Sequence, residues 1–292
     1  MIWSPKNALG TNLMHEKTTI QNKGVSFKEI TALIINNIKN RCEAQSHQNL
    51  THIVVGRPVF YNDKDKKLDD DAQDAMQDIL QSVGFKEMAF EYEPIAAATH
   101  YEQSIEREEI VLVVDMGGGT SDFTVAKLNK NEKDTAKKIL SIGGIHIAGT
   151  NFDTRLSLKS LMPELGLNAH YKTLEGNWMP IPPTLHKDLA VWHKIGFCYN
   201  KNNTAYVKQK IYTSDHPYKF QRLLQTLEQR LGHNLALLVE QAKIALSSQE
   251  TTAIHIGNLT PVIDIAVHTN DLEHAIGTDV EKIMTTLKQV IN

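Results

Sequence analysis

The first third of the chain alternates between helical and extended patterns. Ser26 and Glu29 form a capping box, and the apolar residues that follow recur at helical spacing, which predicts a helix over about 27–45. A short apolar run over 51–60 predicts a buried strand. Apolar residues on one side of the segment 68–83 predict an amphipathic helix after it.

The middle of the chain carries stronger strand signals. The run over 86–94 predicts a strand, and Pro94 predicts the first turn of a helix, where its missing N–H costs nothing. Two β-branched runs within 110–125 predict a pair of buried strands joined by glycines. A third strand is expected within 137–153, before a glycine-rich turn into a helix.

The last part returns to helices. Weak periodicity and several prolines over 163–215 indicate an insertion or a small subdomain. Helices are predicted over 217–230, 233–247 and 271–290, with two strands and a turn within 251–267. Two strand pairs are joined so tightly that they must be antiparallel, which favours an α/β fold with a mixed sheet in two lobes.

Composition narrows the functional class. The 292 residues are 41% hydrophobic and 22% charged, with a net charge of -3 and both signs scattered, which argues against a nucleic-acid binder. Cys42 and Cys198 are the only cysteines, and we expect both to be free and buried, as in a reducing compartment. The thirteen histidines show no zinc-binding spacing. No apolar run approaches the roughly 20 residues that cross a bilayer, so we expect a soluble, cytoplasmic protein without a membrane partner.

The glycine-rich segment 115–122, Asp-Met-Gly-Gly-Gly-Thr-Ser-Asp, carries the clearest chemistry. Three consecutive glycines let main-chain N–H groups approach a bulky anion such as phosphate, and Thr120 adds a hydroxyl. Asp115 and Asp122 would repel that phosphate unless a divalent cation stood between them. The pattern therefore predicts a Mg²⁺–nucleotide phosphate site, with both carboxylates acting through metal-bound water. The alternative is a glycine-rich β-turn with incidental acids.

Five stretches together resemble one protein family. VLVVDMGGGTSDFTVAKL resembles the second phosphate loop of the DnaK-type heat-shock chaperones, members of the actin and sugar-kinase superfamily. GRPVFYNDKD, EYEPIAAATHYE, GGIHIAGTNFDTRL and VEQAKIALSSQ resemble further family motifs in the family's order, most similar to the divergent YegD-like branch. The resemblance implies an α/β, actin-like ATPase (ribonuclease H-like) fold with mixed sheets flanked by helices. It divides the chain into a partial first lobe over 1–110 and a second lobe over 111–292.

The resemblance also implies roles around the phosphates of ATP or ADP. The phosphate oxygens would be held by the glycine turn, which comprises Gly117, Gly118, Gly119 and Thr120. Asp115 and Asp122 take the magnesium–water positions, and Glu93 lies near the attacking water. Lys6, in SPKNALG, matches a lysine that contacts the γ-phosphate; the alternative is a solvated lysine near a frayed terminus.

The adenosine would lie on the predicted helix near residue 240. Glu240, Lys243 and Ser247 stand at i, i+3 and i+7 and would share one helix face; the alternative is an exposed Glu–Lys pair. Ile244 departs from the family, which has a stacking arginine there, so base recognition should be weaker or altered. Gly149 would approach the nucleotide, and the residues after it, Thr150 or Asn151, would cap a helix.

Two family elements have no counterpart in the sequence. The first phosphate loop would precede the Lys6 match, and the second adenosine loop would follow the last helix. We therefore expect a partial nucleotide-binding domain that binds nucleotide weakly and turns over little. The intact parent protein would bind ATP with Mg²⁺, hydrolyse it slowly, and act on unfolded polypeptide or a co-chaperone. The alternatives are an interaction scaffold that does not hydrolyse nucleotide and, third, a small-metabolite kinase.

Overall fold

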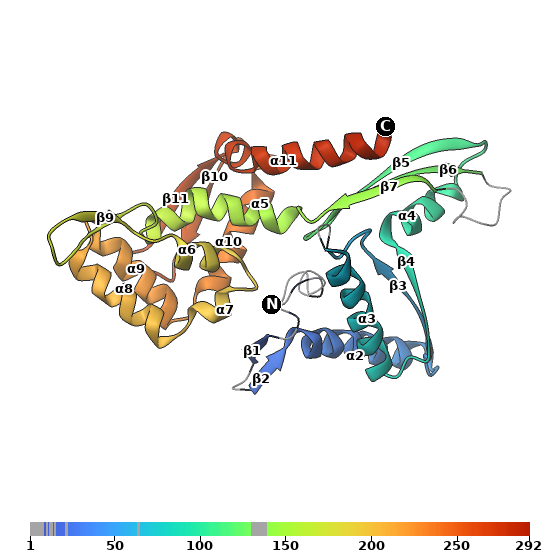
Figure 1. Ribbon diagram of the computed structural model, residues 1–292, viewed down its shortest axis with the longest axis horizontal. Helices are drawn as coiled ribbons and strands as arrows, with labels where there is room; N and C mark the ends of the chain where they lie inside the picture. Colours follow the sequence, from blue (N-terminus) through green and yellow to red (C-terminus); the bar gives the residue numbers. More distant parts are fainter. Residues whose placement is uncertain are drawn as a thin grey trace. The chain divides into compact units, whose positions relative to one another are not determined.

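The computed structural model describes residues 9, 11, 14, 16–20, 23–62, 65–129 and 139–292 (Figure 1). Lys6 lies outside the described residues. The described chain forms two compact units, which we call unit 1 (150–280) and unit 2 (the residues up to Gly149, together with 281–292). The resemblance assigns residues 111–149 to the second lobe, whereas in the structure they belong to unit 2 together with the residues before them. The division into lobes stays a prediction.

Unit 2 begins with a hairpin and a long helix. The helix predicted over about 27–45 is confirmed as α2 (Phe27–Ser46), and Ser26 and Glu29 form the expected reciprocal capping box. An antiparallel pair, β1 (Lys17–Ile20) and β2 (Lys23–Ser26), precedes it. No strand is predicted for these residues, because this polar segment has no alternation of apolar and polar positions.

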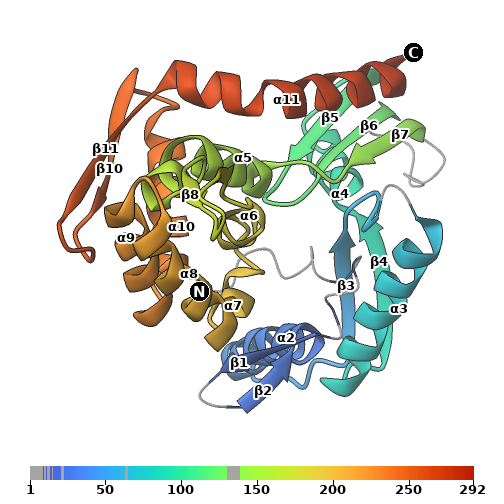
Figure 2. The same ribbon diagram turned by 60° about the vertical axis from the view of Figure 1, so that its left-hand side comes forward.

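A parallel strand pair follows. β3 (His52–Arg57) pairs with β4 (Glu87–Tyr92), and α3 (Lys66–Ser82) connects them. One side of α3 packs against both strands and against α2, as Figure 2 shows for the strands. The prediction of a buried β3 is only half right, because Val54 on its other face is 71% exposed.

A three-stranded antiparallel sheet completes the core of unit 2. Its order is β5 (Glu109–Met116), β6 (Ser121–Leu128) and β7 (Ile139–Ile145), as the glycine-linked pattern predicts. Helix α4 (Glu93–Glu102) packs against β5 and β6. The prediction that β5 is fully buried is wrong, since one face carries exposed Ile110, Leu112, Val114 and Met116. Within the described ranges each sheet is wholly parallel or wholly antiparallel, so the expected mixed sheet is not seen.

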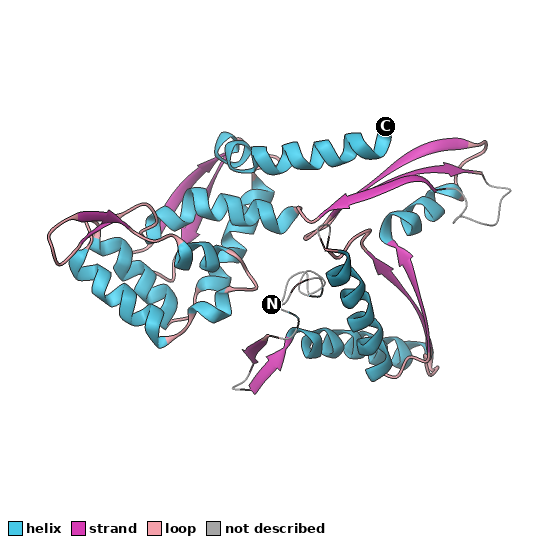
Figure 3. Ribbon diagram, viewed as in Figure 1, coloured by secondary structure: helices cyan, strands magenta, loops and turns pink. Residues whose placement is uncertain are grey.

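Unit 1 is mostly helical (Figure 3). It starts with α5 (Gly149–Leu156), which continues into a π-helical turn (Ser157–Leu161) and a 3₁₀ turn (Met162–Leu165). Residues 163–215, whose weak periodicity indicates an insertion or a small subdomain, form short elements. These are β8 (His170–Lys172), β9 (Trp178–Pro180), α6 (Thr184–Ala190), α7 (Ile195–Cys198) and α8 (Lys201–Thr213). The remaining elements match the predictions: α9 (Pro217–Glu228), α10 (Gly232–Ala245), β10 (Thr251–Ile256), β11 (Ile263–His268) and α11 (Thr269–Ile291).

One apolar core holds unit 1 together. Residues from the segment 163–215, such as Leu185 and Ile195, share it with Phe220 on α9 and Val239 on α10. The segment is therefore an integral part of unit 1. Its weak periodicity follows from short helices, each of which offers only one or two buried turns. Cys198 is free and buried as predicted, whereas the expectation that Cys42 is buried is wrong, because it is free but exposed.

Candidate functional site

The glycine turn in unit 2 links the ends of β5 and β6. Gly117 N–H donates to the Thr120 carbonyl at 3.0 Å, and Gly149 N–H donates to the Gly117 carbonyl at 3.2 Å. The amide of Gly117 is thus used by the turn itself, so any phosphate contact would fall on the amides that follow it. None of the three glycines is among the described residues with left-handed backbone. Their missing side chains are therefore not required by the turn conformation.

Asp122 is the most buried carboxylate near this turn. It is 1% exposed, and its Oδ1 accepts the Val59 N–H at 2.9 Å. Its Oδ2 is also buried and has no hydrogen-bond partner among the described residues. Burial raises the pKa of Asp122 to about 6, against the hydrogen bonds from Thr120 and Val59, and the charges of Asp115 and Glu93 raise it further. A cation near this oxygen would therefore be favourable.

Two further glycines make room for the carboxylates. A Cβ at Gly144 on β7 would lie 2.5 Å from Asp122 Oδ1. A Cβ at Gly56, near the end of β3, would lie 3.0 Å from Cγ of Glu93. Glu93 is the first residue of α4, and Asp115 stands directly opposite Asp122 in the β5–β6 ladder. The structure therefore brings the three predicted carboxylates to the same end of unit 2.

The segment that donates to Asp122 is held by a pair the sequence analysis missed. Arg57 Nη2 lies 3.2 Å from Asp69 Oδ2, and Asp69 Oδ1 accepts the Tyr61 N–H at 2.5 Å. Asp69 lies in the first turn of α3, where a solvated acidic side chain would be expected, yet only 9% of it is exposed. Its spacing offered a signal, since Asp69 stands at i, i+3 and i+7 with the buried Ala72 and Met76.

The predicted adenosine residues lie in unit 1. Glu240 and Lys243 are on α10, where Lys243 Nζ lies 2.7 Å from Oδ1 of Asp153 on α5. Burial raises the pKa of Asp153, and the bond to Lys243 opposes that shift. Burial, and then the charge of Asp153, raises the pKa of Glu240. Placing Ser247 on the same helix face is wrong, because α10 ends at Ala245.

Two further predicted residues, Gly149 and Ile244, lie on α5 and α10. Gly149 is the first residue of α5, so the expectation of a helix cap at Thr150 or Asn151 is wrong. Ile244 is 59% exposed on α10.

Among the described residues, no group of three or more acidic, histidine or cysteine side chains is placed to hold a metal ion. None of the described helices is both long enough and apolar enough to cross a bilayer.

Replacing Lys243 by methionine should destabilise unit 1 by about 1–3 kcal/mol at neutral pH, because the largely buried Asp153 carboxylate would lose its hydrogen-bond donor and cation. The loss should shrink at acidic pH, where Asp153 takes up a proton. Urea unfolding followed by the fluorescence of Trp178 and Trp192, both in unit 1, measures it. Lys187→Met, at an exposed lysine of α6, is the matched control. An equal loss in both variants would contradict the assigned pairing.

Unit 2 thus combines a glycine turn between two antiparallel strands with a buried carboxylate, Asp122, beside that turn. The family model described as Hsp70 protein matches residues 7–164, more than half of the chain. The chain belongs to the Hsp70 family. Membership supports a chaperone-type nucleotide-binding domain with an actin-like ATPase fold, and the observed helices and strands agree with that fold.

Proposed function

We propose that this chain is the ATP- or ADP-binding part of an Hsp70-type chaperone and that it binds the nucleotide with Mg²⁺. The observation that carries the proposal is Asp122, whose buried Oδ2 has no partner among the described residues and whose pKa is raised to about 6. A buried carboxylate that hydrogen bonds do not satisfy is a favourable neighbour for a hydrated cation.

The residues of unit 2 would divide the work at the phosphates. The glycine turn, through Gly118, Gly119 and Thr120, would donate main-chain N–H groups to phosphate oxygens. Asp115 and Asp122 would accept hydrogen bonds from water on the metal, which when bound offsets the negative charge of the phosphates. Glu93, at the start of α4, would orient the attacking water. Lys6 stays a prediction for the γ-phosphate.

In unit 1 the adenosine contacts would be weaker than usual. Glu240 and Lys243 would bind the ribose hydroxyls, with Ser247 as a further contact, and Gly149, which belongs to unit 2, would approach the nucleotide. Lys243 is already paired with Asp153 at 2.7 Å, so a ribose hydroxyl would compete with a carboxylate for it. Ile244 offers no guanidinium to stack on adenine. We therefore expect weak binding by this chain and slow hydrolysis by the parent protein.

The parent protein would use nucleotide turnover to control its binding of unfolded polypeptide or of a co-chaperone. We place it in the cytoplasm and, within the family, in the YegD-like branch. A scaffold that keeps the fold without hydrolysis is the second candidate. Two observations on α10 favour it: the exposed Ile244 and the engaged Lys243.

Isothermal titration with ATP, in Mg²⁺ and in EDTA, tests the proposal. We expect weak binding that EDTA reduces and that Asp115→Asn reduces as well. Asp74→Asn, at an exposed carboxylate of α3, is the matched control and should bind as the parent chain does. If millimolar ATP with Mg²⁺ does not bind, the scaffold is the better description.

A further inference from the structure

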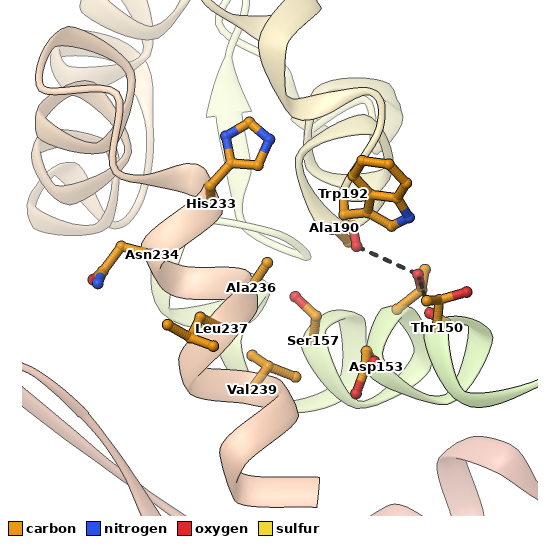
Figure 4. A pocket seen from close by; sticks show the side chains of 11 residues that line it. Thr150, Asp153, Ser157, Ala190, Trp192, His233, Asn234, Ala236, Leu237 and Val239 are labelled. Atoms are coloured by element: carbon orange, nitrogen blue, oxygen red, sulfur yellow. Dashed lines mark hydrogen bonds between the residues drawn. The ribbon is translucent and has the colours of Figure 1, made fainter. Parts of the chain in front are cut away.

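A cavity of about 220 Å³ lies in unit 1, between α5 and α10. Figure 4 shows its lining side chains, which come from these two helices, from the π-helical turn that continues α5, and from the residues that end α6 and follow it. Its walls are mainly apolar, and they include Ala190, Trp192, Ala236, Leu237 and Val239. Drug-sized ligands usually occupy about 300–1,000 Å³, so this cavity fits a smaller molecule.

One hydroxyl group, that of Ser157, faces the cavity. Ser157 is only 4% exposed and lines the cavity, yet within the described residues its hydroxyl makes no hydrogen bond. In Figure 4 this hydroxyl points toward the gap between α5 and α10. The hydroxyl of neighbouring Thr154, by contrast, donates to the carbonyls of Thr150 at 2.9 Å and Ala190 at 3.4 Å. The Ser157 hydroxyl, which can both donate and accept a hydrogen bond, therefore offers a polar contact to a molecule in the cavity.

The charged groups around the cavity indicate which class of ligand it can bind. Asp153 is the one acidic side chain among the described lining residues, which include no lysine or arginine. Its charge is offset by Lys243 at 2.7 Å. An anion would find no cation to pair with, and a cation would have to compete with Lys243. His233 and Asn234 are exposed at the start of α10 and form the rim of the cavity.

We propose that this cavity is a binding site for a small, flat, neutral heteroaromatic molecule, which contacts Trp192 and hydrogen-bonds to Ser157. The inference does not rest on the nucleotide proposal, because neither Trp192 nor Ser157 is among the residues proposed to bind the nucleotide. It assigns a role to Ser157, which no nucleotide motif covers.

Nicotinamide, a neutral heteroaromatic carboxamide, is the probe. Titrated into the ¹⁵N-labelled full chain without nucleotide, it should shift the indole N–H signal of Trp192, which is assigned with Trp178→Phe and Trp3→Phe variants. Nicotinate has the same ring with a carboxylate and should bind at least tenfold more weakly. Equal binding of the two compounds, or no shift at millimolar nicotinamide, would overturn the proposal.

Two variants locate the site. Ser157→Ala should weaken nicotinamide binding about 3- to 10-fold, the effect of one lost hydrogen bond. Ala236→Leu should fill the cavity and abolish the shift, while Ala205→Leu, at an exposed alanine of α8, should leave it unchanged. Amide spectra that match the parent chain away from the cavity show that each variant folds. Unchanged affinity in both Ser157→Ala and Ala236→Leu would place the ligand elsewhere and contradict the inference.

Discussion

Asp122→Asn is expected to weaken Mg²⁺-dependent nucleotide binding at least tenfold and, at the same time, to stabilise the nucleotide-free chain at pH 8. The carboxylate is buried at 1% exposure, with one oxygen lacking a partner. Asparagine keeps an oxygen that can accept the Val59 N–H, which now bonds Oδ1 at 2.9 Å. Asparagine also removes the charge that is unfavourable when buried. The nucleotide-free fold should therefore become more stable, while the affinity for Mg²⁺ with nucleotide should fall.

The raised pKa of Asp122 determines whether the substitution stabilises or destabilises the fold at each pH. Burial raises the pKa of Asp122 from 3.8 to about 6 in the folded chain. Between these values the folded state binds more protons than the unfolded state, so this group lowers stability as pH rises. The penalty is complete above about pH 6, where it amounts to at most about 3 kcal/mol, and is absent below the unfolded pKa. The asparagine side chain mimics the protonated carboxyl, so the advantage of Asp122→Asn should be full at pH 8 and vanish near pH 4.

Thermal unfolding at pH 8 and pH 4, together with ATP titration in Mg²⁺, separates the two effects. Asp70→Asn, at an exposed carboxylate of α3, is the control and should change neither quantity. A variant that is less stable than the parent chain at pH 8 would show that the Asp122 carboxylate is satisfied in the folded state. Unchanged Mg²⁺-dependent affinity would remove Asp122 from the metal–phosphate site.

The local parts of this site could be predicted from the sequence. Alternating apolar runs on both sides of three glycines specify an antiparallel pair, and the register that sets Asp115 opposite Asp122 follows from the short turn. The capping box at Ser26 likewise fixes the start of α2 from four neighbouring residues. In each case the interacting residues lie close together in the chain, so their spacing contains the information.

Contacts between distant segments could not be predicted in this way. The Lys243–Asp153 pair joins helices 90 residues apart, and the bond from Val59 to Asp122 spans 63 residues. The exposed face of β5 was also missed, because β-branched residues look alike whether or not a neighbour covers them. Ser157 gave no signal at all, since its significance comes from a cavity that only the packing of α5 and α10 defines.

The loop after β3 depends on a single carboxylate. Asp69 pairs with Arg57 at 3.2 Å and accepts the N–H groups of Tyr61 at 2.5 Å and Asn62 at 3.3 Å. Arg57 also donates to the Pro58 carbonyl at 3.1 Å and lies over the Tyr61 ring, 5.0 Å from its centroid. This network fixes the loop that presents the Val59 N–H to the candidate site.

Asp69→Ala should therefore destabilise the β3–α3 region by about 3–5 kcal/mol, since it leaves Arg57 largely buried without its counter-charge and two amides without an acceptor. Hydrogen exchange of peptides from β3 and α3 reports this local free energy. Asp70→Ala, one residue along α3 and exposed, is the matched control and should keep the protection of the parent chain. Protection that is as high in Asp69→Ala as in Asp70→Ala would mean that the other side-chain contacts of Arg57, its hydrogen bond to Gln73 and its stacking on Tyr61, hold the loop without Asp69.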